Sequence, residues 1–175
     1  VTNVNDNSPV FTSSATFSAA ENQTSIGTVT ATDADSGDLI TFTVSGSELA
    51  ITLGGVLSFK TAADYETKPT YTATVTVSDG TNTETQAITV NVSDANDNAP
   101  IIESSPVFSA AENQTSIGTV TATDGDSSSI TFTVSGSELA ITSAGVLSFA
   151  SAPDYETKAS YTATVTASDG TNTTT

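Results

Sequence analysis

Hydrophobic and polar residues alternate with a period of two along several segments of the chain. Ile40, Phe42 and Val44 alternate with threonines, and the same spacing runs through residues 71–78 and 87–92. This period is typical of half-buried antiparallel strands, because successive side chains of a strand point to opposite faces of the sheet. No segment has the period of an amphipathic helix, so the chain is predicted to be all-β.

The chain also contains two tandem copies of one module. The run FSAAENQTSIGTVTATD at residues 17–33 recurs unchanged at residues 108–124, and ITFTVSGSELAIT at residues 40–52 recurs at residues 130–142. Self-similarity at a period of about 90 residues indicates that each copy is one structural unit.

Seven strands are predicted in each module, with Gly-, Asp- and Ser-rich turns between them. In the first module they span residues 10–19, 26–32, 39–45, 49–52, 56–59, 71–78 and 87–92. Seven short strands with frequent turn signals predict tandem Greek-key β-sandwiches, an architecture similar to that of immunoglobulin domains. Cysteine and tryptophan are absent, which excludes an antibody-type immunoglobulin core.

The repeat sets the predicted domain boundaries. They are the end of a preceding linker at residues 1–7, domain 1 at residues 8–93, a linker at residues 94–98 and domain 2 at residues 99–175. Domain 2 has no counterpart of residues 86–98, so it is expected to lack its last strand, and the chain is expected to be part of a longer array. The strand at residues 161–168 is then expected to have an unpaired edge, which invites strand exchange or self-association. The favoured alternative is that the missing strand reflects an arbitrary end of the sequence or a disordered tail.

The composition excludes several classes of function. Among 175 residues there are 20 aspartates and glutamates, three lysines and no histidine or cysteine, giving a formal charge of -17. Nucleic acids and anionic membranes bind through clusters of Lys and Arg, so neither is an expected partner. No enzyme is expected, because the chain has no common general base at neutral pH and no thiol nucleophile. No stretch approaches the roughly 18 apolar residues of a membrane span, so direct membrane insertion is not expected.

Most of the acids lie at the predicted ends of the modules. Fifteen of the 20 belong to recurring motifs: Asp6, Glu21, Asp33, Asp35, Asp64, Glu66, Asp79, Asp94, Asp97, Glu112, Asp124, Asp126, Asp154, Glu156 and Asp169. Turn propensity explains any single aspartate, but it does not explain why whole motifs recur where two modules meet. Alternating strand directions place one group of these acids at the end of module 1 and another group at the start of module 2. Asn96 and Asn98 lie in the linker. Clustered carboxylates with Asn oxygens suit Ca²⁺, whereas Mg²⁺ prefers fewer protein ligands.

These motifs resemble those of the cadherin-repeat family, and the resemblance covers nearly the whole chain. The matching elements are Glu21-Asn22, Asp64-Tyr65-Glu66, Asp94-Ala95-Asn96-Asp97-Asn98, Asp124-Gly125-Asp126 and Asp169. The resemblance implies one complete junction that binds two or three Ca²⁺ ions. Its metal ligands would be Glu21, Asp64, Glu66, Asp94, Asn96, Asp97, Asn98, Asp124, Asp126 and Asp169. Tyr65 stands where the family more often has arginine, which leaves both flanking carboxylates in place.

Two further sets of residues form candidate half-sites. The first comprises Asn5, Asp6, Asn7, Asp33, Asp35 and Asp79. The second comprises Glu112, Asp154 and Glu156. Each is expected to be half of a junction with another repeat.

The resemblance implies that calcium fixes the angle between neighbouring repeats and stiffens an extracellular, cell-surface adhesin that supports calcium-dependent cell adhesion. The expected partners are calcium, neighbouring repeats and the same protein on another cell. Near-identical repeats rich in Thr and Ser, without cysteine, resemble bacterial cadherin-like surface proteins. The alternative is a calcium-dependent carbohydrate-binding module that recognises a polysaccharide; its few candidate aromatics, Tyr65, Tyr71, Tyr155 and Tyr161, are instead expected to pack in the core or loops.

Overall fold

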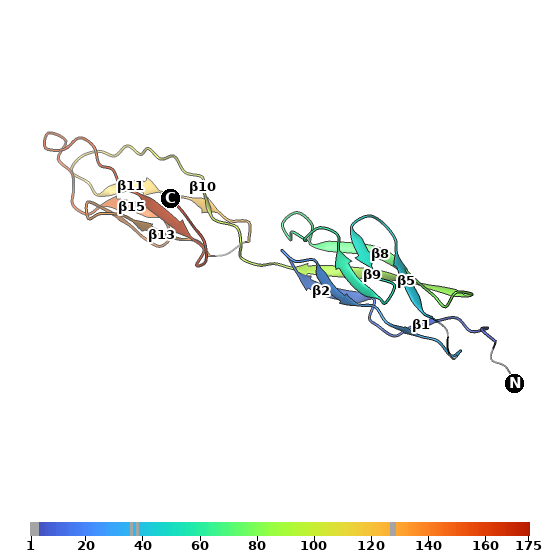
Figure 1. The fold of residues 1–175 in the computed structure, drawn as a ribbon. Coiled ribbons are helices and arrows are strands. Elements are labelled where there is room, and N and C mark those ends of the chain that lie inside the picture. The colour runs from blue at the N-terminus through green and yellow to red at the C-terminus, as the bar shows by residue number, and fades with distance from the viewer. Residues whose placement is uncertain (1–3, 36, 38, 127–128) are drawn as a thin grey trace. The chain divides into compact units, whose positions relative to one another are not determined.

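The structure, a computed structural model, describes residues 4–35, 37, 39–126 and 129–175. Residues 1–3 of the predicted first linker lie outside this part. The chain divides into unit 1 (Val1–Ala95) and unit 2 (Asn96–Thr175), a division that falls inside the predicted linker (Figure 1). All regular structure in the described ranges is strand, and no helix able to cross a bilayer occurs in them. The prediction of an all-β fold is confirmed.

The described residues of unit 1 form nine strands. They are β1 (Val10–Phe11), β2 (Thr16–Ala20), β3 (Ser25–Thr28), β4 (Ala31–Thr32), β5 (Thr41–Val44), β6 (Leu49–Ile51), β7 (Val56–Phe59), β8 (Thr70–Ser78) and β9 (Thr83–Ser93). A four-stranded sheet in the order β2-β9-β8-β5 and a three-stranded sheet in the order β3-β7-β6 form the two layers, and β1 pairs with β4. The crossovers in these orders are those of a Greek key.

Two of the predicted strands are each divided in the structure. The segment predicted as one strand at residues 10–19 forms β1 and β2, which join different sheets. Serines mark the crossing, because Ser13 Oγ accepts a bond from the Thr30 N–H (3.1 Å) and Ser14 Oγ accepts one from the Thr16 N–H (3.0 Å). These side chains satisfy backbone donors where the ladder is interrupted. The segment predicted at residues 26–32 is likewise divided into β3 and β4.

The expectation of purely antiparallel pairing is wrong for β2. This strand runs parallel to β9, with Phe17 opposite Val90 and Ala19 opposite Val92. Because β2 and β9 run in the same direction, both end at the same end of the unit, and β8, antiparallel to β9, begins there. This topology decides which loops share an end.

The core of unit 1 lies between its two sheets. Val75 and Val77 of β8 and Ile88 and Val90 of β9 are almost completely buried, whereas Thr74, which precedes Val75, is exposed. The period-two pattern therefore separates the core face from the solvent face, as the sequence predicts. The burial of apolar surface stabilises this arrangement by about 25 cal/mol for each Å² removed from water.

Gly55 lies in the turn between β6 and β7, where two backbones approach closely. Its φ is +87°, and a Cβ atom placed on it would lie 2.2 Å from the carbonyl oxygen of Val29. The Val29 N–H donates a 2.8 Å bond to the Gly55 carbonyl, which holds the two segments together. Gly145 repeats this arrangement against Val120 in unit 2, again at 2.2 Å. Both the φ value and the contact require glycine.

Unit 2 has the same plan with fewer paired residues. Its strands are β10 (Ile101–Ile102), β11 (Ser116–Thr119), β12 (Ala122–Thr123), β13 (Thr131–Val134), β14 (Leu139–Ile141), β15 (Val146–Phe149), β16 (Val165–Ser168) and β17 (Thr173–Thr174). The prediction of a strand over residues 161–168 is too long, because β16 begins only at Val165. Residues 107–111, which correspond to β2, form a coil (Figure 1).

The sequence explains both differences. In unit 1, β9 supplies the partner for β2 and for the first half of β8. The sequence of unit 2 contains counterparts of only the first three residues of β9, and β17 pairs with β16 only at Ala167 and Ser168. The core cluster is correspondingly smaller, with Val120, Phe132, Leu147 and Ala167 as its buried members.

Candidate metal centre

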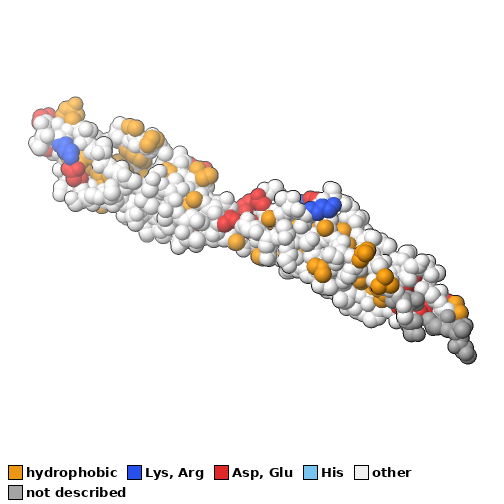
Figure 2. Space-filling model, in the orientation of Figure 1, with side chains coloured by type: hydrophobic (Ala, Val, Ile, Leu, Met, Phe, Trp, Pro, Cys, Tyr) orange, Lys and Arg blue, Asp and Glu red, His pale blue; other side chains and the backbone are white. Residues whose placement is uncertain are grey.

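The acidic motifs of unit 1 lie at its two ends. At the end where β2 and β9 finish and β8 begins, the chain places Glu21 directly after β2, Asp64 and Glu66 in the loop before β8, and Asp94 directly after β9. Figure 2 shows acidic side chains gathered at the end of unit 1 away from the N-terminus, while the surface between the ends is mostly neutral. The predicted grouping of these four residues at one end is therefore present within the unit.

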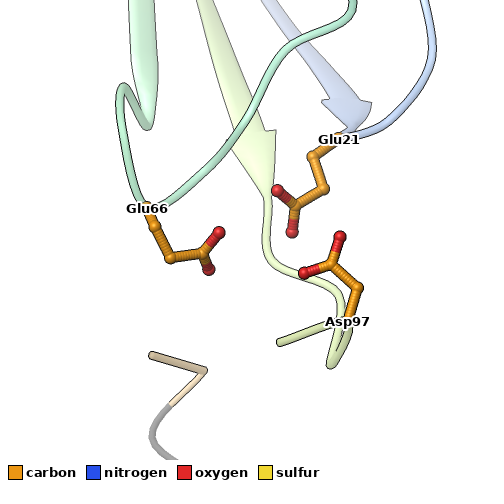
Figure 3. Close-up of side chains that lie close together, drawn as sticks. All are labelled: Glu21, Glu66 and Asp97. Atoms are coloured by element: carbon orange, nitrogen blue, oxygen red, sulfur yellow. The ribbon is translucent and has the colours of Figure 1, made fainter. Parts of the chain in front are cut away.

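Glu21 is held by the backbone on both sides of its carboxylate. The Tyr65 N–H donates to Oε2 and the Ala95 N–H donates to Oε1, both at 2.7 Å. The residue is only 5% exposed. Figure 3 shows Glu21 at the end of β2, Glu66 in the loop before β8, and Asp97 in the segment after β9. Glu21 therefore ties the β7–β8 loop to the segment after β9, and its remaining lone pairs have a fixed direction.

Asp64 is fixed by the same loop. The backbone N–H of Thr67 donates to Oδ1 (3.1 Å) and the Thr67 hydroxyl donates to Oδ2 (2.8 Å). The hydroxyl bond is the largest contribution that lowers the pKa of Asp64. This carboxylate is accordingly charged at neutral pH and available to a cation.

At the opposite end of unit 1, Asp35 organises the predicted N-terminal half-site. Its Oδ2 accepts bonds from the backbone N–H groups of Asp6 (3.0 Å) and Asn7 (2.8 Å), and the Asn7 amide donates to Oδ1 (3.2 Å). Asp33 Oδ1 accepts the Asp35 N–H at 2.8 Å. Asp33 Oδ2 is buried and has no hydrogen-bond partner among the described residues.

Asn82 completes this end and was missed by the sequence analysis. Its side-chain amide donates to Asn5 Oδ1 (2.9 Å), the Asn7 carbonyl (2.7 Å) and Asp79 Oδ2 (3.1 Å). Asp79 Oδ1 also accepts the Asn82 N–H at 2.6 Å. The available signal was the recurrence of SDGTNT, in which the asparagine follows the aspartate by three residues in both copies.

Replacing Asn82 with alanine is expected to lower the free energy of unfolding of unit 1 by about 1–2 kcal/mol, because three partly exposed hydrogen bonds are lost. Differential scanning calorimetry in calcium-free buffer measures this change. Asn91→Ala, at an exposed position of β9, is the control and should change little. Equal effects of the two substitutions would show that the Asn82 bridge contributes nothing.

Unit 2 repeats the same network with its own residues. Asp126 accepts bonds from the backbone N–H (2.8 Å, to Oδ2) and the side-chain amide (2.9 Å, to Oδ1) of Asn98, and its own N–H donates to Asp124 Oδ1 (3.0 Å). The Asn172 amide donates to Asn96 Oδ1 (3.1 Å) and to Asp169 Oδ2 (3.2 Å).

This network groups three carboxylates. Asp124, Asp126 and Asp169 each present an oxygen, and these oxygens lie within 4.8 Å of one another. Asp124 Oδ2 is buried without a hydrogen-bond partner among the described residues, as is its equivalent on Asp33. A buried, unpaired carboxylate oxygen among like charges is unfavourable unless a cation approaches it. The donor set is entirely oxygen, which fits Ca²⁺.

The far end of unit 2 contains the other predicted half-site. Glu112, Asp154 and Glu156 present oxygens within 4.8 Å of one another, and all three are exposed. The Tyr155 N–H donates to Glu112 Oε2 at 3.1 Å. Glu21, in the identical motif, is buried and also accepts the Ala95 N–H.

The two lysines with described ion pairs do not neutralise the carboxylates of the acidic motifs. Lys68 pairs with Glu48 and Lys158 pairs with Glu138, and both glutamates lie outside the acidic motifs. Each of these lysines also lies over a tyrosine ring, Tyr71 and Tyr161 respectively, at 4.7 and 4.6 Å from the centroid.

The tyrosines considered for sugar binding are mostly engaged in packing. Tyr65 and Tyr71 pack against the core of unit 1, and Tyr161 packs edge-to-face on Phe149 with 5.0 Å between ring centroids. Tyr155 differs from the expectation, because it is 64% exposed. One exposed ring does not make an aromatic platform.

Hydrogen bonding lowers the pKa of several motif aspartates. The Asn7 N–H lowers that of Asp35, and the Thr157 hydroxyl lowers that of Asp154. For Asp79, burial acts in the opposite direction, but bonds from Asn82 and Thr81 outweigh it and the pKa is also lowered.

These shifts predict acid destabilisation. A carboxyl group whose pKa is lower in the folded state contributes stability above its unfolded pKa of about 3.9, and this contribution is lost as the pH falls through the folded pKa. The unfolding temperature of the calcium-free chain is therefore expected to fall as the pH decreases from about 5 to about 2. Calorimetry across this range measures it; a temperature that rises on acidification would mean that relief of charge repulsion dominates.

Comparisons with known proteins give consistent results. A scan against protein-family models finds no match. The chain is 33% identical, over 97% of its length, to human Cadherin EGF LAG seven-pass G-type receptor 2, and 33% identical, over 95% of its length, to human Protocadherin Fat 4. It spans only 6% and 4% of those proteins.

Solved structures show the same similarity. Mouse Cadherin-23 EC22-24 has a TM-score of 0.78 and 27% identity, covering 97% of this chain and 61% of that one. The Protocadherin GammaB4 extracellular domain has a TM-score of 0.78 and 26% identity, covering 99% of this chain and 32% of that one. These structures support the tandem β-sandwich described above.

Proposed function

Because the chain belongs to the cadherin-repeat family, we propose that its acidic ends bind Ca²⁺ and that bound calcium stiffens consecutive repeats of a cell-surface adhesion protein. The observation that carries this proposal is the way in which the segment after β9 is held. The Ala95 N–H is bonded to Glu21 in unit 1, and the Asn98 N–H is bonded to Asp126 in unit 2. Each unit therefore holds the segment that contains Asp97 through the carboxylate of a proposed ligand.

The proposed ligands combine the acids of both units with the linker. They are Glu21, Asp64, Glu66, Asp94, Asn96, Asp97, Asn98, Asp124, Asp126 and Asp169. Eight of these ten are carboxylates, so two or three divalent ions would neutralise half or more of their charge. The unpaired Oδ2 of Asp124 supports a cation on the side of unit 2.

The two outer sets are proposed to be halves of equivalent sites. Asn5, Asp6, Asn7, Asp33, Asp35 and Asp79 would act with the end of a preceding repeat. Glu112, Asp154 and Glu156 would act with the start of a following repeat. The network around Asp35 and Asp79 supports the first of these, since it reproduces the network around Asp126 and Asp169 in unit 2.

In this proposal calcium acts mechanically. Without the ion, the clustered carboxylates repel one another and the linker is free to bend. With the ion, ligands from two repeats share one coordination shell, which fixes their relative angle. Sites in extracellular modules commonly bind calcium with dissociation constants of about 10⁻⁴–10⁻³ M, which suits the outside of a cell.

The wider biological setting is also part of the proposal. The chain spans about 6% of the length of the seven-pass receptor relatives, so adhesion and its partners, including the same protein on another cell, are proposed for the whole protein. The prediction of a bacterial host rests on composition alone, and the relatives named above come from animals.

The proposal is tested by small-angle scattering of the chain in calcium and in chelator, together with calorimetric calcium titration. At a total calcium concentration of about 10⁻³ M, the distribution of particle lengths is expected to become narrower and the mean particle length to increase. Magnesium at the same concentration is the control and should do neither. Calcium binding with an unchanged scattering curve would contradict the mechanical role; absence of binding would contradict the whole proposal.

A further inference from the structure

A turn of residues 64–68, between β7 and β8, carries two of the proposed calcium ligands, Asp64 and Glu66. The backbone N–H of Lys68 donates to the Asp64 carbonyl at 2.9 Å and closes the turn. The Thr67 hydroxyl donates to the Asp64 carboxylate at 2.8 Å within it. The turn therefore ends at Lys68, and contacts that hold Lys68 also hold the backbone on which both carboxylates are placed.

The side chain of Lys68 has two partners. Its ammonium group forms an ion pair with Glu48 and lies over the Tyr71 ring, 4.7 Å from the centroid. The ammonium is attracted both by the carboxylate charge and by the negative face of the ring. The side chains of Lys68 and Glu48 are 41% and 50% exposed, so the ion pair alone is weak. The two contacts together hold the side chain in one position.

The two partners of Lys68 belong to different sheets. Glu48 lies directly before β6, and its carbonyl accepts the Lys60 N–H at 2.9 Å. Tyr71 lies in β8, and its ring packs edge-to-face on Phe59 with 4.9 Å between centroids. Lys68 therefore ties the turn to the three-stranded sheet through Glu48 and to the four-stranded sheet through Tyr71.

Unit 2 contains the same cluster. Lys158 pairs with Glu138 and lies over the Tyr161 ring at 4.6 Å, and its backbone N–H donates to the Asp154 carbonyl at 2.9 Å. The arrangement therefore belongs to the module, because each turn with two acidic residues is followed by a lysine held in the same way.

The ion pair with Glu48 also directs the lysine charge away from the proposed ligands. Lys68 follows Glu66 by two residues and Asp64 by four, so an ammonium group free to move could pair with these carboxylates and compete with a cation. In the structure it pairs with Glu48, which lies outside the acidic motifs. The contribution of Lys68 to the site is therefore one of position.

We propose that Lys68 is a positioning residue for the calcium ligands Asp64 and Glu66: it clamps their turn to both sheets and so holds the carboxylates in place before the ion binds. Ligands that are already ordered bind more tightly, because less conformational freedom is lost on binding. This role rests on the proposed function. Lys158 is the equivalent residue of unit 2.

The test compares variants of the 175-residue chain by isothermal titration calorimetry with calcium. Lys68→Met keeps a long apolar side chain but removes the clamp, and is expected to weaken calcium binding by about threefold. Lys60→Met is the matched control, because Lys60 is exposed and has no ion pair among the described residues. Loss of a positive charge near a cation site by itself strengthens binding. The control should therefore bind calcium as tightly as the wild type or slightly more tightly.

Rescue and hydrogen exchange separate positioning from a change in charge. Lys68→Arg retains the charge and can stack on Tyr71, so it is expected to restore the wild-type affinity. In calcium-free buffer, exchange at the backbone N–H of position 68 reports on closure of the turn. After correction for intrinsic rates, it is expected to be about threefold faster in Lys68→Met, because the turn opens more often. It should be unchanged in Lys68→Arg and Lys60→Met.

Failure of the clamp is distinguishable from failure of the proposed function. A wild-type chain that binds no calcium would overturn both. A wild-type chain that binds calcium, with equal or tighter binding by Lys68→Met, would overturn the clamp alone. The clamp is also wrong if Lys60→Met weakens binding as much as Lys68→Met, if Lys68→Arg gives no rescue, or if affinity falls without faster exchange in the turn.

Discussion

Replacing Asp97 with alanine is expected to weaken calcium binding by the proposed ligands by at least tenfold, equivalent to about 1.4 kcal/mol. Asp97 lies between Asn96 and Asn98, which are both held by unit 2: Asn172 donates to Asn96 Oδ1 and Asn98 donates to Asp126. The residues on both sides of Asp97 are therefore held in place by hydrogen bonds. Removal of a carboxylate lowers the charge of the site and leaves one coordination position to water. Isothermal titration calorimetry with calcium measures the change.

Glu84→Ala is the matched control, because it removes one negative charge from an exposed position of β9 outside the acidic motifs. It should leave the affinity nearly unchanged, since screened surface charges act weakly over distance. Equal losses in the two variants would mean that net charge, and not coordination, governs calcium binding. An unchanged affinity in Asp97→Ala would remove Asp97 from the proposed ligands.

Replacing Gly55 with alanine is expected to destabilise unit 1 by about 2–5 kcal/mol. The positive φ costs about 1–2 kcal/mol for a residue with a Cβ atom. The 2.2 Å approach of that atom to the Val29 carbonyl oxygen adds the cost of overpacking, about 1–3 kcal/mol. Because Gly55 accepts the Val29 N–H, relief of the contact also stretches a hydrogen bond between the two segments. Calorimetry is expected to show a fall of roughly 8 °C or more in the unit 1 transition.

Gly46→Ala separates the two causes. Gly46 has a φ of +84°, but a Cβ atom placed on it meets nothing within 4 Å. This variant should show only the conformational cost of about 1–2 kcal/mol. If the two variants are equally stable, the contact with Val29 is relieved without cost and the close approach does not constrain the fold.

Local sequence patterns predict most of the fold. The strands predicted at residues 71–78 and 56–59 correspond closely to β8 and β7, and in both of them the core-facing side chains are more buried than their neighbours. The turns are equally clear, since Gly46 and Gly80 have positive φ where turn residues were expected. The acidic motifs at each end of a unit also follow from alternating strand directions.

The parts that were missed depend on which strands become neighbours. The pattern in residues 10–19 continues through the point where the chain crosses between sheets, so it gives no sign that β1 and β2 are separate. The parallel pairing of β2 with β9 joins segments more than 70 residues apart, which no local pattern encodes. Asn82 was missed because it is not an acid: its side-chain amide acts by donating hydrogen bonds to Asn5, Asn7 and Asp79, which are proposed ligands.

The central position of β9 in its sheet has a consequence for synthesis on the ribosome. The strand pairs with β2 on one side and β8 on the other, yet it is the last strand of the repeat to be made. At about 5–20 residues per second, the first strands of a 90-residue repeat wait about 5–18 s for this partner. During that interval two strand edges and a hydrophobic face are exposed beside a neighbour of nearly the same sequence. Translation speed, and any chaperone that covers the nascent chain, should therefore determine how many copies acquire their own final strand.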